Sequence, residues 1–195
     1  MTSSERPQRL PNKPRVARDL CWQPAPCASG LYRPWLTDRG SLTQRIATRS
    51  RGMMVKVVFQ GRRRLHRDEI FLAGRDASAV AYTRDVVLFC GSTPVVYAHS
   101  VLAPGRCGPG LRLMRGLGSM PLGAALFADP RIRRLKLRQR KLAPGHELVR
   151  QARRATHGHT DCGPARFMWA RRSLFVVGKS PILVTEVFLP GVLTL

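Results

Sequence analysis

The chain has 195 residues, a length that fits one domain with a sizeable hydrophobic core. Hydrophobic residues make up 44% of it, yet no stretch approaches the roughly 20 consecutive apolar residues that a membrane helix needs. The N-terminus carries charges and prolines without an apolar run, which excludes a secretory signal and predicts a cytoplasmic protein.

The formal net charge of +23 raises the hypothesis of a nucleic-acid-binding protein. However, most of the 34 basic residues are arginine, and Ala, Gly and Pro are abundant, a composition that a GC-rich genome encodes whatever the function. Aromatic residues amount to only 7%, and no helix-turn-helix, zinc-finger or RNP pattern occurs. We therefore expect a surface that attracts small anions, without a specific nucleic-acid partner.

The cysteines are odd in number and irregularly spaced, which argues against a disulfide framework and a Cys-rich zinc site. The closest approach to a metal motif is His157 and His159 followed by Cys162. This group lacks a fourth ligand at a standard spacing and lies in a sequence typical of a loop. The sequence therefore predicts reduced thiols and no metal or other cofactor.

The first predicted elements follow a segment without periodicity. Residues 1–30 carry several prolines and scattered charge, which predicts a poorly ordered lead-in. Ser41 and Gln44 then form an S-x-x-Q capping box, which predicts a short helix ending near Arg49. The β-branched and aromatic run 53–60 predicts a strand.

Two hairpins give the strongest structural signals, because each joins two β-rich runs through a turn sequence. The first joins 79–90 to 95–102 through Gly-Ser-Thr-Pro, and the second joins 171–177 to 182–189 through Gly-Lys-Ser-Pro. Short connections of this kind favour antiparallel neighbours.

Between the hairpins, residues 111–127 predict a helical stretch that is broken at Gly118, with a second helix opening at Pro121. Residues 131–154 are basic and weakly amphipathic, and no element is assigned to them. Together these patterns predict one α+β domain over residues 31–195, an antiparallel β-sheet with helices packed on it. We expect it to be a monomer.

Glu186 is a charged residue inside an otherwise apolar strand. Side chains alternate along a strand, so Glu186 shares one face with Val184 and Phe188, while Leu183 and Val187 occupy the other. A carboxylate in such surroundings is costly unless a polar group meets it. Glu186 is therefore either a structural residue, in an ion pair or near solvent at the end of the strand, or part of a functional pocket wall.

Arg84 has the same character, because it lies between Tyr82 and Val86 on one face of a predicted strand. Pairing with Asp85 is disfavoured, since consecutive strand residues point to opposite faces. An inward Arg and an inward Glu on one sheet would form a polarised apolar pocket, suited to a small ring with a carboxylate at one end and a hydroxyl at the other.

Several of these segments, taken in order, resemble the motifs of the chorismate pyruvate-lyase family. The matching segments are PWLTDRGSLTQRI, YTRDVVLFC, VVYAHSVLAP, LGSMPLGAALF and RRSLFVVGKSPILVTEVFLP. The resemblance implies an antiparallel sheet with helices and a buried site without metal or cofactor. It also implies a lyase that converts chorismate to 4-hydroxybenzoate and pyruvate, the first step of the ubiquinone ring pathway.

The resemblance also assigns roles to individual residues. The family's Arg for the ring carboxylate falls on Arg84, and its Glu for the 4-hydroxyl falls on Glu186. The product-contacting Leu of the Pro-Leu-Gly turn falls on Leu122, and a Met that lines the site corresponds to Leu42.

One position departs from the family pattern, because His99 occupies a strand position where the family usually has Arg. Two interpretations remain open. His99 faces the same pocket as Arg84 and meets the second carboxylate of chorismate while protonated, or it is a neutral His packed against Tyr97, with another arginine such as Arg106 in that role.

A rival function class is a non-catalytic module that senses small aromatic acids, since effector domains of some bacterial regulators resemble this fold. Such regulators need an N-terminal DNA-binding domain, for which the first 30 residues are too short. The enzyme is favoured because it explains Arg84 and Glu186 together.

Overall fold

Six antiparallel strands form one sheet in the computed structural model of the chain, which describes residues 22–24, 29–50, 52–105, 108–159 and 167–195. The strand order is β1-β2-β3-β6-β5-β4, so β1 and β4 lie at the edges. The strands are β1 (Met53–Arg64), β2 (Val80–Cys90), β3 (Thr93–Leu102), β4 (Arg133–Leu142), β5 (Met168–Val177) and β6 (Ser180–Phe188).

Five α-helices and three short 3₁₀ segments complete the described chain. The α-helices are α1 (Arg33–Thr37), α2 (Leu42–Ala47), α3 (Pro109–Gly116), α4 (Leu122–Ala128) and α5 (Glu147–Ala155). The 3₁₀ segments are η1 (Gly30–Tyr32), η2 (Ile70–Ala73) and η3 (Pro190–Thr194).

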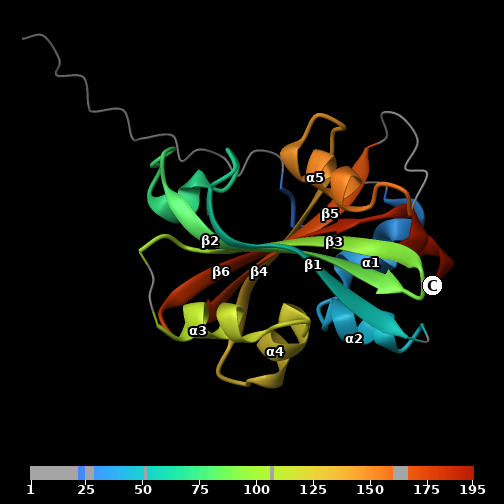
Figure 1. The fold of residues 1–195 in the computed structure, drawn as a ribbon, viewed down its shortest axis with the longest axis horizontal. Helices are drawn as coiled ribbons and strands as arrows, with labels where there is room; N and C mark the ends of the chain where they lie inside the picture. Colours follow the sequence, from blue (N-terminus) through green and yellow to red (C-terminus); the bar gives the residue numbers. More distant parts are fainter. Residues whose placement is uncertain (1–21, 25–28, 51, 106–107, 160–166) are drawn as a thin grey trace, which may run out of the picture.

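The helices cover the two faces of the sheet unequally. Figure 1 shows α3 and α4 on one side of the sheet and α5 on the other. The residues of α1 to α4 pack into two core clusters on the first face, while α5 and η2 pack into separate clusters on the second face. The α+β class with an antiparallel sheet is therefore confirmed.

Both predicted hairpins are present, with turns tighter than expected. Gly91 and Ser92 alone connect β2 to β3, while Gly178 and Lys179 alone connect β5 to β6. Both glycines have positive φ angles, 58° and 60°, which a residue with a Cβ rarely adopts.

The centre of the sheet is built by a pairing between the two hairpins. β3 pairs with β6, so β3 lies between β2 and β6. The register places Arg84 opposite Ser100, and Glu186 opposite Ala98. The two predicted charges therefore lie on one face of the sheet, with small residues of β3 between them.

Most of the predicted helices are also present. The Ser41 hydroxyl accepts a hydrogen bond from the backbone N–H of Gln44 and caps α2. The stretch broken at Gly118 is α3 followed by α4, with Pro121 at the N-cap of α4 rather than in its first turn.

The basic region 131–154 contains β4 and α5, which the sequence pattern left unassigned. In the segment 1–30, the described Trp22 is buried in the core, and Gln23 pairs with Gln139 of β4. Part of the expected lead-in is thus built into the fold.

Candidate functional site

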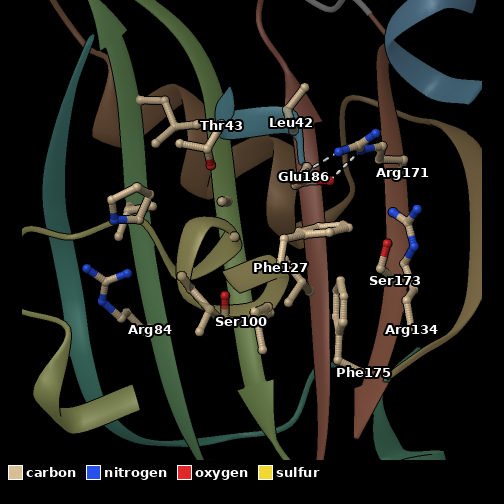
Figure 2. Close-up of a pocket in the computed structure, with 18 residues that line it drawn as sticks. Leu42, Thr43, Arg84, Ser100, Phe127, Arg134, Arg171, Ser173, Phe175 and Glu186 are labelled. Atoms are coloured by element: carbon tan, nitrogen blue, oxygen red, sulfur yellow. Dashed lines mark hydrogen bonds and ion pairs between the residues drawn. The ribbon is translucent and has the colours of Figure 1, made fainter. Parts of the chain in front are cut away.

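One buried pocket lies between the sheet and the helices α2 and α4, with a free cavity volume of about 40 Å³. Figure 2 shows side chains from the central strands and from both helices around it. Four of the five predicted site residues line this pocket: Leu42, Arg84, Leu122 and Glu186.

Arg84 is a buried cation, with only 1% of its surface exposed. Its Nε donates to Oε1 of Gln60 at 3.1 Å, and its Nη2 donates to the carbonyl oxygens of Gly118 and Met120 at 2.8 and 3.1 Å. Burial lowers the pKa of Arg84, but an arginine remains charged.

No carboxylate pairs with Arg84 among the described residues, and its Nη1 has no hydrogen-bond partner there. Asp85, the neighbour in sequence, instead pairs with Arg63 at 2.8 Å and points to the other face of the sheet. A buried charge is costly without a counter-ion, and a guanidinium in this setting is chemically suited to an anion.

Glu186 is held by Arg171, a residue that the sequence analysis did not single out. The Nε of Arg171 donates to Oε2 of Glu186 at 2.5 Å, and its Nη2 lies 3.4 Å from Oε1. The register explains the contact, since Arg171 lies directly opposite Glu186 in the pairing of β5 with β6. The dashed lines of Figure 2 mark this ion pair.

The carboxylate of Glu186 is thus a member of an ion pair and also lines the pocket. Arg171 is 1% exposed, and its Nη1 donates to the carbonyl oxygens of Trp35 and Asp38. Its fork is therefore fully used, and it fixes the orientation of Glu186 in the pocket.

The remaining pocket wall is mostly apolar. Leu42 and Leu122 are 2% and 5% exposed, and they enter from α2 and α4. Ser100 and Ser173 line the same pocket. A few polar groups in an apolar cavity are the usual composition of a small-molecule site.

A third arginine, Arg134, also lines the pocket, and the sequence pattern did not indicate it. Its guanidinium lies 5.2 Å from the ring centroid of Phe127 and 6.0 Å from that of Phe175. It begins β4 in a region where basic residues are frequent, so neither charge nor periodicity distinguished it from its neighbours.

The expectation that His99 faces the same pocket as Arg84 is wrong. The register places His99 opposite Asp85, so it points to the other face of the sheet. There its Nδ1 lies 2.5 Å from Oδ1 of Asp85 and its Nε2 lies 3.2 Å from Oε1 of Glu69. His99 is a partner of two carboxylates, and the other residue considered for its role, Arg106, lies outside the described residues.

His66, Glu69 and His99 form the one described group whose ligand atoms are close enough to suggest a metal ion, within 4.8 Å of one another. The two imidazole rings, however, are stacked at 4.7 Å with only 19° between their planes. An ion bound by both would need to lie in both ring planes, which nearly parallel rings do not allow. The geometry of this group is better suited to hydrogen bonds that share a proton than to metal binding. The other candidate metal set, His157, His159 and Cys162, cannot be assessed as a group, because Cys162 lies outside the described residues.

Comparison with known proteins gives a consistent family. The family model described as chorismate lyase matches residues 17–194. A protein of Azoarcus sp. named "Probable chorismate pyruvate-lyase" is 45% identical over 174 residues, which cover 89% of this chain and 91% of the relative. A relative of the same name from Nitrosospira multiformis is 43% identical, over 89% of this chain and 95% of that protein. Another from Nitrosomonas europaea is 38% identical, over 91% of this chain and 98% of that protein.

Solved structures support the fold alone. The chain aligns with PhnF from Mycobacterium smegmatis at a TM-score of 0.51 and 16% identity, over 79% of this chain and 65% of that one. The effector domain of the same protein aligns at 0.50 and 17% identity, over 78% and 90%.

Proposed function

The chain belongs to the chorismate lyase family, and from this premise we propose that it is a chorismate pyruvate-lyase whose pocket between the sheet, α2 and α4 holds the substrate. The single observation that carries the assignment of the pocket is Arg84, a buried cation that has no acidic partner in the described part of the chain and faces Glu186 across apolar walls.

Chorismate carries a ring carboxylate, a 4-hydroxyl and an enolpyruvyl ether on a cyclohexadiene ring. The reaction breaks the ether bond between C3 and oxygen and removes the hydrogen from C4, so the ring becomes aromatic. The departing enolate gains a proton and leaves as pyruvate. Because aromatisation drives the reaction, the protein has to position the substrate and to assist the movement of one proton.

Arg84 binds the ring carboxylate in this proposal. Its Nε and Nη2 are already fixed by Gln60 and by two backbone carbonyls, so its position is set before the substrate arrives. The Nη1 remains for the ligand. A guanidinium held in this way loses little conformational entropy on binding.

Glu186 accepts a hydrogen bond from the 4-hydroxyl and fixes the orientation of the ring. Its ion pair with Arg171 keeps the carboxylate in place, and it orients Glu186 without Arg171 itself touching the ligand. The same carboxylate is the group best placed to assist proton movement at C4.

The walls contributed by Leu42 and Leu122 exclude water from the ring. Exclusion of water strengthens the contacts made by Arg84 and Glu186, since charges interact more strongly where the effective dielectric constant is low. The substrate and both products are small water-soluble anions, which supports our proposal of a cytoplasmic enzyme. None of the described helices is long and apolar enough to cross a bilayer.

The direct test is incubation of the purified chain with chorismate in the presence of EDTA. We expect 4-hydroxybenzoate and pyruvate in equal amounts, because the proposed chemistry uses only side chains. Folded protein that releases no pyruvate would overturn the lyase. Tight binding of 4-hydroxybenzoate without turnover would indicate a sensor instead.

Variants at the two charges test the roles in the pocket. Arg84→Gln should weaken binding of 4-hydroxybenzoate by about 2–5 kcal/mol, the scale for truncating one member of a buried charge pair, and Arg84→Lys should restore little. Glu186→Gln should lose most of kcat/KM and also lower the melting temperature, since it leaves Arg171 buried without its counter-ion. Calorimetry, steady-state kinetics and thermal unfolding are the measurements. A Glu186→Gln enzyme with near-normal kcat/KM would show that this carboxylate is structural.

A further inference from the structure

Two arginines face the pocket without an acidic partner among the described residues, Arg84 and Arg134, and Figure 2 shows them on opposite sides of the cavity. We propose that Arg134 binds the second carboxylate of chorismate, the one on the enolpyruvyl group. This inference rests on the proposed function, because it concerns the same substrate and the same pocket.

A β-bulge turns Arg134 toward the pocket. In the pairing of β4 with β5, Leu137 lies opposite Ser173 on the pocket face. Simple alternation from Leu137 would place Leu135 on that face and Arg134 on the other. The register shifts between Arg134 and Lys136, so Arg134 lies opposite Phe175 and faces the pocket, while Leu135 is left 52% exposed.

The surroundings of Arg134 favour an anion. Its guanidinium is partly buried beside Phe127 and Phe175, and no hydrogen bond or ion pair to it occurs among the described residues. Burial lowers its pKa, and the positive charge of Arg171 lowers it further. A carboxylate bound here would relieve both effects.

Arg171 does not fill this role, although it also lines the pocket. Each of its three nitrogens already donates to Glu186 or to a backbone carbonyl, as described above. Arg134 is therefore the pocket cation, besides Arg84, whose donors are free within the described part of the chain.

The chemistry of the substrate places the second carboxylate on the same side. The ether oxygen is on C3, next to the C4 that carries the hydroxyl, so the enolpyruvyl group lies near whatever holds that hydroxyl. With Arg84 on the ring carboxylate and the hydroxyl at Glu186, this side is the Glu186 end of the pocket. Arg134 is at that end, because Figure 2 shows it on the same side of the cavity as Arg171 and Glu186, away from Arg84.

Arg134 also lies at the boundary between the pocket and the surface. Arg134 and Phe127 line the buried pocket and a second, outer cleft as well. That cleft contains the basic side chains of Arg33, Arg39 and Lys136. A dianionic substrate would meet this positive cleft first, and the pyruvate half would remain nearest to it.

If Arg134 binds the second carboxylate, the substrate and the aromatic product should depend on it differently. Chorismate has two carboxylates, whereas 4-hydroxybenzoate has only the one assigned to Arg84. Loss of Arg134 should therefore weaken the binding of chorismate selectively, while loss of Arg84 should weaken the binding of both ligands.

The test compares Arg134→Gln with the matched control Arg133→Gln, which removes the same charge from the exposed neighbour. We expect Arg134→Gln to raise the KM for chorismate about 10- to 100-fold, the effect of losing one good charge-assisted contact, and to change the Kd of 4-hydroxybenzoate less than about threefold. Arg133→Gln should leave both values within about threefold of the wild type. Arg134→Lys should fall between Arg134→Gln and the wild type, and it serves as the reporter if Arg134→Gln does not fold.

The inference would be overturned if Arg134→Gln weakened the binding of chorismate and of 4-hydroxybenzoate equally, or if it left the KM for chorismate unchanged. An equal effect of Arg133→Gln would also overturn it, because it would show that only the net charge matters. These outcomes differ from failure of the proposed function, which would appear as a wild-type chain that releases no pyruvate from chorismate.

Discussion

His99 is the residue at which the chain departs from the motif it otherwise resembles, and its surroundings give that departure a physical meaning. It is 1% exposed and lies between the carboxylates of Asp85 and Glu69. Burial alone would lower the pKa of His99, but the charge of Glu69 and the hydrogen bond to Asp85 outweigh burial and raise it to about 9. His99 is therefore a cation that neutralises two buried acids, a task an arginine could perform at every pH.

Other charged groups share this network, and they set the sign of its effect. Arg63 pairs with Asp85, while Arg172 lies 3.8 Å from Glu69, and the ring of His66 stacks on His99. Burial raises the pKa of Glu69, but the charge of His99 holds it well below its usual value. Glu69 is thus charged throughout the neutral range, and the titration of His99 falls at alkaline pH, near its pKa of about 9.

The raised pKa of His99 predicts a loss of stability at alkaline pH. The folded-state value of about 9 exceeds the unfolded value near 6.5, so the contribution is complete below about pH 6.5 and is lost as pH rises through 9. We expect the free energy of unfolding to fall by on the order of 3 kcal/mol over this range. Urea unfolding at a series of pH values measures it.

Two variants serve as controls for this titration. His99→Gln should be less stable at pH 6 and should lose most of the pH dependence between 6.5 and 9. His157→Gln removes an exposed imidazole and should keep the wild-type profile. If His99→Gln kept the full dependence, the titrating group would be another one.

At the scale of elements, the pocket depends on how closely short segments approach the sheet. α2 and α4 contact each other over the pocket, and a Cβ at Gly123 would lie 3.0 Å from Oγ1 of Thr43. The close approach explains a glycine at the start of α4. The two helices bring Leu42 and Leu122 to one cavity, although 80 positions of sequence separate them.

Gly191 of the C-terminal segment η3 packs closely against the first residues of β3. A Cβ there would lie 2.6 Å from Cγ2 of Thr93 and 2.7 Å from the carbonyl oxygen of Pro94. A backbone atom cannot rotate away, so we expect Gly191→Ala to lower the free energy of unfolding by about 1–3 kcal/mol. Gly145→Ala, where a Cβ meets nothing within 4 Å, is the matched control. Equal stability of the two variants in denaturant unfolding would contradict this account.

At the scale of the whole molecule, the charge of +23 has to be reconciled with a small anionic substrate. A positive surface steers anions toward the pocket and also binds polyanions without selectivity. We expect duplex DNA to bind weakly, with no preference among unrelated sequences, and with an affinity that falls steeply between 50 and 200 mM salt. Fluorescence anisotropy with two unrelated duplexes measures this. Sequence-selective binding that survives physiological salt would contradict it.

The sequence by itself determined the class of fold and the polarity of the pocket. Strand alternation placed Arg84 and Glu186 among apolar neighbours, and turn chemistry paired the strands into two hairpins. Both signals are local, because each depends on residues a few positions apart. The edge strand β4 was not predicted, because its basic, partly exposed residues do not alternate regularly between buried and exposed positions.

Only the tertiary structure decided which side chains meet across the sheet. The direction of His99 depends on the register of β3 against β2, and a shift of one residue would reverse it. Arg171 reaches Glu186 through the register of β5 with β6, and Arg134 faces the pocket because of a bulge. Register and bulges are fixed by the packing of the whole core, which is why the sequence indicated one arginine of the pocket and the fold supplied the other two.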